Sequence, residues 1–170
     1  MSKALVIIDI QNDYFASGAF PLWNAEATVA NAVRAIETAR AQGIAVVLVQ
    51  HLANAGGQAP LLNAGTKGAE LHPSIRAAVP DAPIVTKEHA DAFVNTTLEE
   101  TLSSLGATEL WVCGMMTQNC VTHTAISRSA EKYDVAIIAD ACTTVTEVLH
   151  QIALHAVSTR MRLTSLAEAF

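Results

Sequence analysis

The chain has 170 residues and a formal net charge of −6. A charge of this sign gives no electrostatic footprint for binding nucleic acid or an acidic membrane surface. Only 15% of the residues are charged, which is low against the usual ~25% and leaves few charges to cover the surface. We therefore expect one domain over residues 1–170 and a sizeable subunit interface, as in a homodimer or homotetramer.

The cellular location is predicted from the N-terminus, the apolar runs and the cysteines. Met1–Lys3 leads directly into a strand-like segment, without the charged and apolar regions of a secretory leader. The apolar runs are too short to cross a bilayer. The three cysteines form no CxxC pair and no zinc-ribbon spacing. These features predict a cytoplasmic protein whose thiols are reduced.

Strand and helix patterns alternate along the chain. The first strand is predicted at residues 4–8, where a continuous, mostly β-branched run is typical of a parallel strand covered on both faces. Further strands are predicted at residues 44–49, 84–86, 111–114, 135–139 and 161–164, and helices at residues 24–42, 97–105, 121–133 and 146–159. This alternation predicts a three-layer α/β/α fold, in which one doubly wound, mostly parallel sheet of about six strands lies between helices.

The ends and faces of two helices are predicted from single residues. Asn24 is a suitable N-cap for the first helix, and Gly43 stops it. The last helix carries the apolar residues Val148, Ile152 and Val157.

The segment Leu52–His72 differs in kind from its surroundings. Alanine, glycine, asparagine and proline dominate it, and it has no clear period. A loop of this length in a compact domain is usually a lid, a binding loop or an interface arm. The sequence does not decide between these three roles.

Three reactive side chains follow strands of the predicted sheet. Asp9 closes the first strand, Lys87 the third, and Cys120 follows the turn after the fourth. Ligands of an open parallel sheet lie beyond the carboxyl ends of its strands, where the strand order reverses. If the sheet is wound from its middle outward, Asp9 and Cys120 meet there and Lys87 reaches in from the side. Each residue also has an ordinary structural interpretation, as a cap, a surface lysine and a core cysteine.

Cys120 is the candidate nucleophile. A helix is predicted to begin near it, and a helix N-terminus favours thiolate over thiol. A thiol also needs a base or a cation beside it to react near neutral pH, and Asp9 and Lys87 are suited to these two tasks. The alternative is a buried, inert cysteine, which is how we interpret Cys113, in the fourth strand, and Cys142, just past the fifth.

Three motifs resemble those of the isochorismatase-like cysteine hydrolases, which include nicotinamidase and N-carbamoylsarcosine amidase. They are the segment Val6–Phe15 (VIIDIQNDYF), Lys87 after a strand, and the segment Gly114–Val121 (GMMTQNCV). The motifs occur in this order at fitting separations, and the resemblance covers nearly the whole chain. The resemblance is specific for the superfamily and uninformative about the substrate.

The resemblance implies a catalytic triad of Asp9, Lys87 and Cys120. It also implies a cis peptide bond between Met115 and Met116, and an oxyanion hole formed by the backbone N–H groups of Met116 and Cys120. The chemistry that it implies is attack of the thiolate on a carbonyl carbon, loss of an amine, and hydrolysis of the thioester by water that Asp9 activates.

One departure from the family pattern concerns metal binding. Metal-binding nicotinamidases carry an Asp-x-His pair after the second strand, whereas His51 and Ala53 stand at the matching positions here. His72 is too isolated to complete a site, because zinc takes at least three protein ligands. We therefore expect no catalytic metal and no other cofactor, and nicotinamide is a doubtful substrate.

Five residues are candidates for lining a substrate pocket, among them His51, for which a structural role is an equal alternative. The five are Phe15, Gln11, His51, Phe93 and Met115. For Trp23, which is also near the predicted catalytic edge, core or interface packing is the better interpretation.

The leading interpretation is a metal-independent cysteine hydrolase that cleaves a small amide, ureido or related C–N bond. Its partner is then a small-molecule substrate. A catalytically idle member that binds or scaffolds small molecules is the alternative from another class. Hydrolysis of a vinyl ether, the isochorismatase reaction, is a further alternative that Cys120 disfavours, since members with that activity do not rely on a cysteine.

Overall fold

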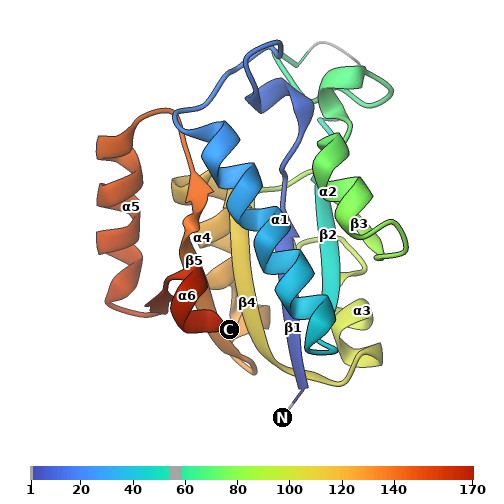
Figure 1. The fold of residues 1–170 in the computed structure, drawn as a ribbon, viewed down its shortest axis with the longest axis vertical. Coiled ribbons are helices and arrows are strands. Elements are labelled where there is room, and N and C mark those ends of the chain that lie inside the picture. Colours follow the sequence, from blue (N-terminus) through green and yellow to red (C-terminus); the bar gives the residue numbers. More distant parts are fainter. Residues whose placement is uncertain (1, 54–58) are drawn as a thin grey trace.

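The structure, a computed structural model, describes residues 2–53 and 59–170. Its strands form one parallel sheet in the order β3-β2-β1-β4-β5-β6 (Figure 1). The strands are β1 (Ser2–Ile8), β2 (Ala45–His51), β3 (Ile84–Lys87), β4 (Ala107–Met115), β5 (Asp134–Thr143) and β6 (Arg162–Thr164). The predicted parallel sheet is confirmed, and the reversal of strand order lies between β1 and β4.

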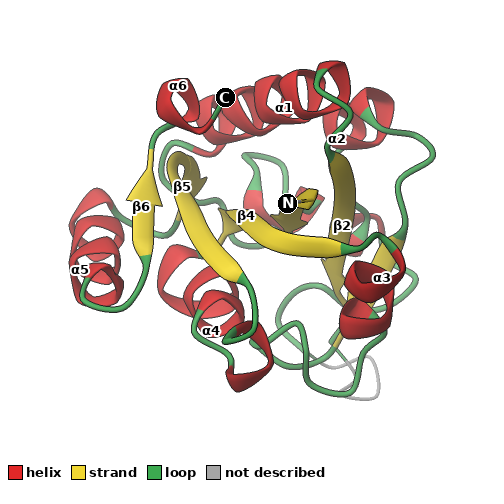
Figure 2. Cartoon of the chain, turned by 90° about the horizontal axis from the view of Figure 1, so that it is seen from below, coloured by secondary structure: helices red, strands yellow, loops and turns green. Residues whose placement is uncertain are grey.

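Helices cover both faces of this sheet. They are α1 (Ala25–Ala41), α2 (Pro73–Ala78), α3 (Leu98–Ser104), α4 (Thr122–Ala125), α5 (Glu147–Ser158) and α6 (Leu166–Ala169). Figure 2 shows α1, α2 and α6 along one face and α3 and α4 on the other, with α5 beside the β6 edge. The predicted three layers are therefore present. Among the described residues, no helix has the length and hydropathy that spanning a bilayer requires.

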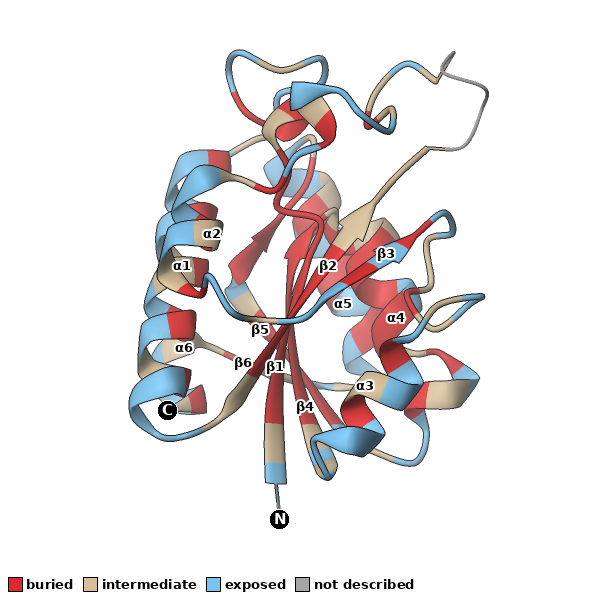
Figure 3. Ribbon diagram, turned by 90° about the vertical axis from the view of Figure 1, so that its right-hand side faces the viewer, coloured by how far each residue is buried: buried red, intermediate tan, exposed pale blue. Residues whose placement is uncertain are grey.

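The centre of the core is β1, which pairs with β2 on one side and β4 on the other. Ala4 to Ile8 are all at most 1% exposed, as expected for a parallel strand covered on both faces. Figure 3 shows the buried strands in the middle and the exposed surfaces on the outer sides of the helices. The polar groups that follow β1 and β4 are therefore placed by well-packed strands.

The segment after Cys120 differs from the predicted long helix. It consists of a π-helical turn (Thr117–Val121), the short α4 and a 3-10 turn (Arg128–Ala130). The break occurs at Ser127, whose backbone is extended and whose side chain accepts a hydrogen bond from the N–H of Ser129. A serine that caps a new turn in this way competes with continuation of the preceding helix.

Two other local predictions also need correction. Asn24 precedes α1 in a left-handed conformation with φ 55°, and its side chain makes no capping hydrogen bond. β5 runs on to Thr143, so Asp140 and Cys142 lie within the strand rather than after it. The extension accompanies an irregularity in the pairing of β4 with β5 between Val112 and Gly114. Such irregularities shift register locally, and the alternation of side chains does not reveal them.

Candidate active site

Strand register brings the ends of four strands to one edge of the sheet. Ile8, the last residue of β1, pairs with Val49 and Gly114 on its two sides. His51 and Lys87, the last residues of β2 and β3, pair with each other. Because all four strands are parallel, Asp9, His51, Lys87 and the turn that carries Cys120 lie at the same edge. This is the edge at which an open α/β sheet binds ligands.

The ammonium group of Lys87 is the centre of this cluster. Its Nζ lies 2.8 Å from Oδ2 of Asp9 and 3.2 Å from Sγ of Cys120. It also lies 3.0 Å from Nδ1 of His51 and donates a hydrogen bond of 3.0 Å to the carbonyl oxygen of His89. The structure thus brings the three residues of the predicted triad together. His51 and the His89 carbonyl are further partners of Lys87 that the sequence analysis did not assign.

The three side chains of the predicted triad are buried. Asp9, Lys87 and Cys120 are 0%, 2% and 3% exposed. Asp9 follows β1 in a left-handed conformation with φ 51°, and its N–H donates to the carbonyl of Val49 at 3.0 Å. Non-glycine residues are uncommon in this region, and those that occupy it gather at functional sites. Within the part of the chain that the structure describes, Oδ1 of Asp9 is buried without a hydrogen-bond partner.

The charge state of the cluster follows from burial and proximity. Burial and the Asp9 carboxylate raise the pKa of the Cys120 thiol to about 12, although Lys87 acts in the opposite direction. Burial lowers the pKa of Lys87, but Asp9 and Cys120 outweigh this and raise it above its usual value. Burial and the Lys87 ammonium lower the pKa of His51. Near pH 7 the cluster therefore holds an ammonium, a neutral imidazole and a thiol. The thiolate expected from a helix N-terminus is not the resting form.

The donor atoms at this edge do not suit a resident metal ion. One atom each of Asp9, His51 and Cys120 lies within 4.8 Å of the others, which is close enough to surround a cation. The ammonium of Lys87, however, contacts all three residues at 2.8 to 3.2 Å. A lysine ammonium donates hydrogen bonds and has no lone pair to offer a metal. His72 caps α2 and packs against Phe15 with tilted rings, and it is not part of this cluster.

The backbone before Cys120 closes the site against β1. The peptide bond between Met115 and Met116 is cis, as the family resemblance implies. Gly114 has φ 126°, and a Cβ on it would lie 2.0 Å from the carbonyl oxygen of Ile8. Only glycine therefore fits this close approach of β4 to the end of β1. From the outside, Nδ1 of His150 in α5 lies 2.8 Å from Oγ1 of Thr117 and supports the turn.

Cys120 faces a cavity of about 310 Å³, and none of the described residues that line it is a lysine, arginine, aspartate or glutamate. The cavity is lined by Tyr14, Phe20, His51, Ala53, Ala59, Pro60, Leu61, Leu62, Met116, Asn119 and Cys120. Small-molecule sites are typically apolar with a few polar groups of this kind. Met116 and Cys120, the predicted oxyanion-hole residues, are both part of the wall.

Of the five predicted pocket residues, only His51 lines this cavity. Gln11 is fully buried. Its amide N–H donates to the carbonyl of His51 at 2.8 Å, and its amide oxygen accepts from the N–H of His51 at 2.9 Å. Met115 is also fully buried, and its neighbour Met116 lines the cavity instead. Gln11 and Met115 are therefore buried residues next to His51 and Met116, which line the cavity.

The two predicted aromatic residues lie elsewhere. Phe15 packs on His72, with ring centroids 4.3 Å apart, and lines a separate cavity of about 810 Å³. Phe93 stacks on Tyr133 with ring centroids 6.3 Å apart. Tyr14 and Phe20 provide the aromatic wall near Cys120 instead. The sequence shows aromatic residues in these loops, but it does not reveal which of them points toward the sulfur.

The long loop contributes to the wall of the cavity. Residues 59–62 line it, whereas residues 54–58 lie outside the described part of the chain. The loop is held by Asp13, whose Oδ2 accepts a hydrogen bond of 2.7 Å from the N–H of Leu62. Gly68 packs directly on the same carboxylate, since a Cβ there would lie 2.1 Å from its oxygen. Asp13 is a positioning residue that the sequence analysis missed, although it stands within a recognised motif.

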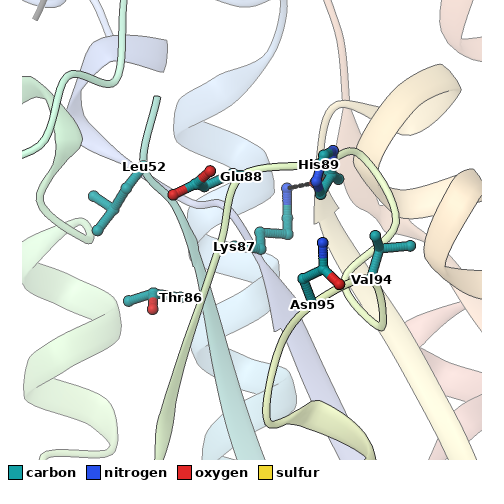
Figure 4. A pocket seen from close by; sticks show the side chains of 7 residues that line it. All are labelled: Leu52, Thr86, Lys87, Glu88, His89, Val94 and Asn95. Carbon is teal, nitrogen blue, oxygen red and sulfur yellow. Dashed lines mark hydrogen bonds between the residues drawn. The ribbon is translucent and has the colours of Figure 1, made fainter. Parts of the chain in front are cut away.

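A second cavity, of about 240 Å³, lies on the β3 side of Lys87 (Figure 4). It is lined by Leu52, Thr86, Lys87, Glu88, His89, Val94 and Asn95. Figure 4 shows the Lys87 side chain running along this cavity toward its hydrogen bond with His89. Lys87 therefore borders a more polar space on one side and the Cys120 site on the other.

Comparison with known proteins identifies relatives over most of the chain. YddQ of Bacillus subtilis, an isochorismatase family protein, is 38% identical over 86% of this chain and 80% of its own length. The nicotinamidase of Escherichia coli is 31% identical over 82% of each protein. An Arabidopsis thaliana relative, 30% identical over 88% of this chain and 84% of its own length, is named a probable inactive nicotinamidase.

Solved structures and a family model agree with these relatives. The crystal structure of an isochorismatase family protein from Desulfovibrio vulgaris has a TM-score of 0.89 and 27% identity, covering 98% of this chain and 95% of that one. The model of the isochorismatase domain matches residues 3–168. A match over nearly the whole described chain, together with a shared fold, leads to one conclusion. The chain belongs to the isochorismatase family of hydrolases.

Proposed function

We propose that this protein is a metal-independent cysteine hydrolase that cleaves a small amide, ureido or related C–N bond. The observation that carries the proposal is the position of Lys87 Nζ, 2.8 Å from the Asp9 carboxylate and 3.2 Å from the Cys120 sulfur. Nucleophile, base and cation are thereby within reach of one another beside a cavity of about 310 Å³, which is large enough for a small molecule. The activities of relatives named nicotinamidase and ureidoacrylate amidohydrolase support a C–N bond as the target.

The first half of the proposed reaction begins with a thiol. Asp9 takes the proton of Cys120 while the sulfur bonds to the carbonyl carbon, and Lys87 stabilises the charge that forms between them. The N–H groups of Met116 and Cys120 hold the oxyanion. The C–N bond then breaks, and Asp9 returns the proton to the leaving amine. A thioester on Cys120 remains.

The second half regenerates the thiol. Asp9 takes a proton from water, and the resulting hydroxide bonds to the thioester carbon. The C–S bond breaks, the carboxylic acid leaves, and Cys120 recovers its proton from Asp9. The buried Oδ1 of Asp9, which lacks a partner in the described part of the structure, is suited to receive these protons in turn.

The cavity wall supports an uncharged substrate. Its polar side chains are neutral near pH 7: Tyr14, whose pKa burial raises above its usual value, together with His51 and Asn119. A charged substrate group placed against this wall would lose its hydration without gaining an ionic partner.

A screen for ammonia release tests the proposal. Small primary amides and ureides are incubated with the protein, and ammonia is measured with a coupled glutamate dehydrogenase assay. We expect one class of compound to be hydrolysed, with Cys120→Ala inactive and Cys142→Ala, a matched cysteine variant, close to wild type. If the whole set yields no ammonia and Cys120 reacts with iodoacetamide no faster than Cys142, the protein is an idle member, like the Arabidopsis relative named inactive.

We also propose that the protein forms a homo-oligomer through α5. Val148 and Ile152 are 69% and 60% exposed, while Val157 is buried. Between Val148 and Thr159 the helix carries no lysine, arginine, aspartate or glutamate. A groove of about 330 Å³ lies beside Ile152, and its lining is mostly apolar, with Gln118, Thr122 and Arg160 as its polar members. Around a two-fold axis, Ile152 of each copy can enter the groove of the other, which favours a second copy over a charged partner.

Size and mass test this arrangement. A stable interface covers about 800 Å² on each partner, roughly a tenth of the 7840 Å² surface. Light scattering should give at least a dimer for the wild type and a monomer for Ile152→Glu. Val94→Glu, at an exposed apolar residue outside α5, should leave the mass unchanged. A monomeric wild type would contradict the proposal.

A further inference from the structure

Lys87 has more acceptors than hydrogen-bond donors. A lysine ammonium carries three N–H groups, whereas four acceptors from the described residues surround Nζ at 2.8 to 3.2 Å. The Asp9 carboxylate is the nearest of these and carries the opposite charge. The His89 oxygen belongs to the backbone. His51 and Cys120 therefore compete for the remaining N–H group.

We infer that His51 is a positioning residue that occupies the third N–H of Lys87 in the free enzyme and so keeps Cys120 in its thiol form. The inference rests on the proposed role of Cys120 as the nucleophile. The distances favour His51, since its Nδ1 lies 3.0 Å from Nζ and the sulfur of Cys120 lies 3.2 Å away. A neutral thiol is also a weaker acceptor than an imidazole nitrogen.

The imidazole is held in place for this role. His51 is the last residue of β2, the strand between β1 and β3, so the Lys87 side chain crosses the end of β2 to reach Asp9. Gln11 bonds to both the N–H and the carbonyl of His51 and fixes its backbone. Because Nδ1 accepts from Lys87, the ring is neutral and its proton is on Nε2.

The ionisable groups around His51 are consistent with a neutral ring. Those that act on it are Lys87, Asp9, Glu88 and His89, and burial together with Lys87 lowers its pKa. The imidazole therefore remains an acceptor at neutral pH, and one N–H of Lys87 remains occupied.

The competition has a consequence for reactivity. Once a thiolate forms, it attracts an N–H of Lys87 more strongly than a neutral imidazole does, because hydrogen bonds between ions are the stronger kind. The N–H then passes from His51 to the sulfur. Removing the acceptor at position 51 should make this N–H available at rest, lower the pKa of Cys120 and raise its reactivity without substrate.

Two substitutions separate the acceptor from the bulk of the ring. His51→Leu keeps the volume and excludes water but cannot accept a hydrogen bond. His51→Asn places an amide oxygen near the position of Nδ1 and restores the acceptor. The exposed His155→Asn serves as the matched histidine control. Thermal unfolding of each variant verifies that it is folded before its reactivity is compared.

The measurement is the rate of Cys120 alkylation by iodoacetamide between pH 6 and 11, followed by peptide mapping. We expect His51→Leu to react at least about tenfold faster than wild type near pH 8, as the size of one hydrogen bond to a charged group indicates. The profile of His51→Leu should also be shifted to lower pH. His51→Asn and His155→Asn should follow the wild-type profile.

Two results would overturn the inference. Only the second of them would also contradict the proposed function. A His51→Leu profile that coincides with wild type, or that is slower at every pH, shows that His51 does not compete with Cys120. The proposed hydrolase is unaffected by that result. A wild-type protein whose Cys120 reacts no faster than Cys142 at any pH removes the nucleophile itself, and the inference with it.

Discussion

Cys120 and Cys142 are equally buried but lie in different surroundings. Each is 3% exposed, and burial raises the pKa of each thiol to about 12. Sγ of Cys142 donates to the carbonyl of Ile138 at 3.3 Å within β5. Sγ of Cys120 instead lies 3.2 Å from the Lys87 ammonium and faces a cavity.

The comparison shows what distinguishes a candidate nucleophile from a core thiol in this fold. Neither burial nor the resting pKa separates the two residues. The difference is a cation and a carboxylate at the sulfur, together with space for a substrate. Cys113, which is fully buried in β4, resembles Cys142, because burial raises its pKa as well.

The largest expected effect comes from removing the thiol group at each of the two positions in turn. Cys120→Ala should lower kcat/KM by at least about 10⁴-fold, since removal of a nucleophile disables the whole catalytic unit. Cys142→Ala should stay within about threefold, because a small buried residue replaces another of similar size. Steady-state kinetics on the amide found in the screen provides both values. Comparable losses of kcat/KM in the two variants would contradict the assignment of Cys120 as the nucleophile and Cys142 as a core thiol.

Removing the cation should make the surroundings of Cys120 resemble those of Cys142. Lys87→Met is expected to lower kcat/KM about 10³-fold through loss of charge stabilisation. It also leaves the Asp9 carboxylate buried without its partner, which costs about 3–5 kcal/mol of folding free energy. Asp9→Asn combined with Lys87→Met should recover stability in thermal unfolding but not activity. Recovery of both would mean that the ion pair serves the fold alone.

The cavity is the second difference between the surroundings of the two sulfurs. A substitution at Asp13 tests its role. Asp13→Asn weakens the bond to the N–H of Leu62 that holds residues 59–62 over Cys120. We expect KM to rise about tenfold, as for loss of one hydrogen bond to a charged group, with a smaller change in kcat. A fall in kcat with KM unchanged would place Asp13 in the chemistry instead of the wall.

The smallest effect concerns what the two thiols share. A pKa raised from 9.0 to about 12 means that the folded state retains a proton that the unfolded state loses. Each thiol therefore stabilises the fold fully below pH 9, and the contribution declines as the pH rises toward 12. Cys142→Ala should make the decline of unfolding free energy shallower by up to one proton, about 1.4 kcal/mol per pH unit. Urea unfolding at pH 8 to 11 measures it, and an unchanged slope would contradict the raised pKa.

The sequence predicted the edge of the sheet at which the candidate site lies, but not the contacts within that site. Asp9, Lys87 and Cys120 were placed there because parallel strands end together, and register in the structure brings them within hydrogen-bond distance. The partnership of Lys87 with His51 depends on β2 lying between β1 and β3, and strand order is not contained in strand patterns.

The cavity wall was the least predictable part. Phe15 and Tyr14 are neighbours in one short turn, yet only Tyr14 faces Cys120, because the turn geometry directs each side chain. Likewise, the α5 pattern indicated a helix correctly but not which of its apolar residues remain exposed. A helix shows an apolar stripe whether it packs on its own sheet or on another chain.

Alkylation of the three cysteines tests the central claim most directly, because it needs no substrate. The protein is treated with a limiting amount of iodoacetamide at pH 7 to 8, and the adducts are mapped by mass spectrometry. We expect the adduct on Cys120, with Cys113 and Cys142 unmodified, and slower labelling of Cys120 in Lys87→Met, which removes the cation that lowers the pKa of this thiol. Slow, equal labelling of all three cysteines, unaffected by that substitution, would show that the Cys120 sulfur is no more than part of the core.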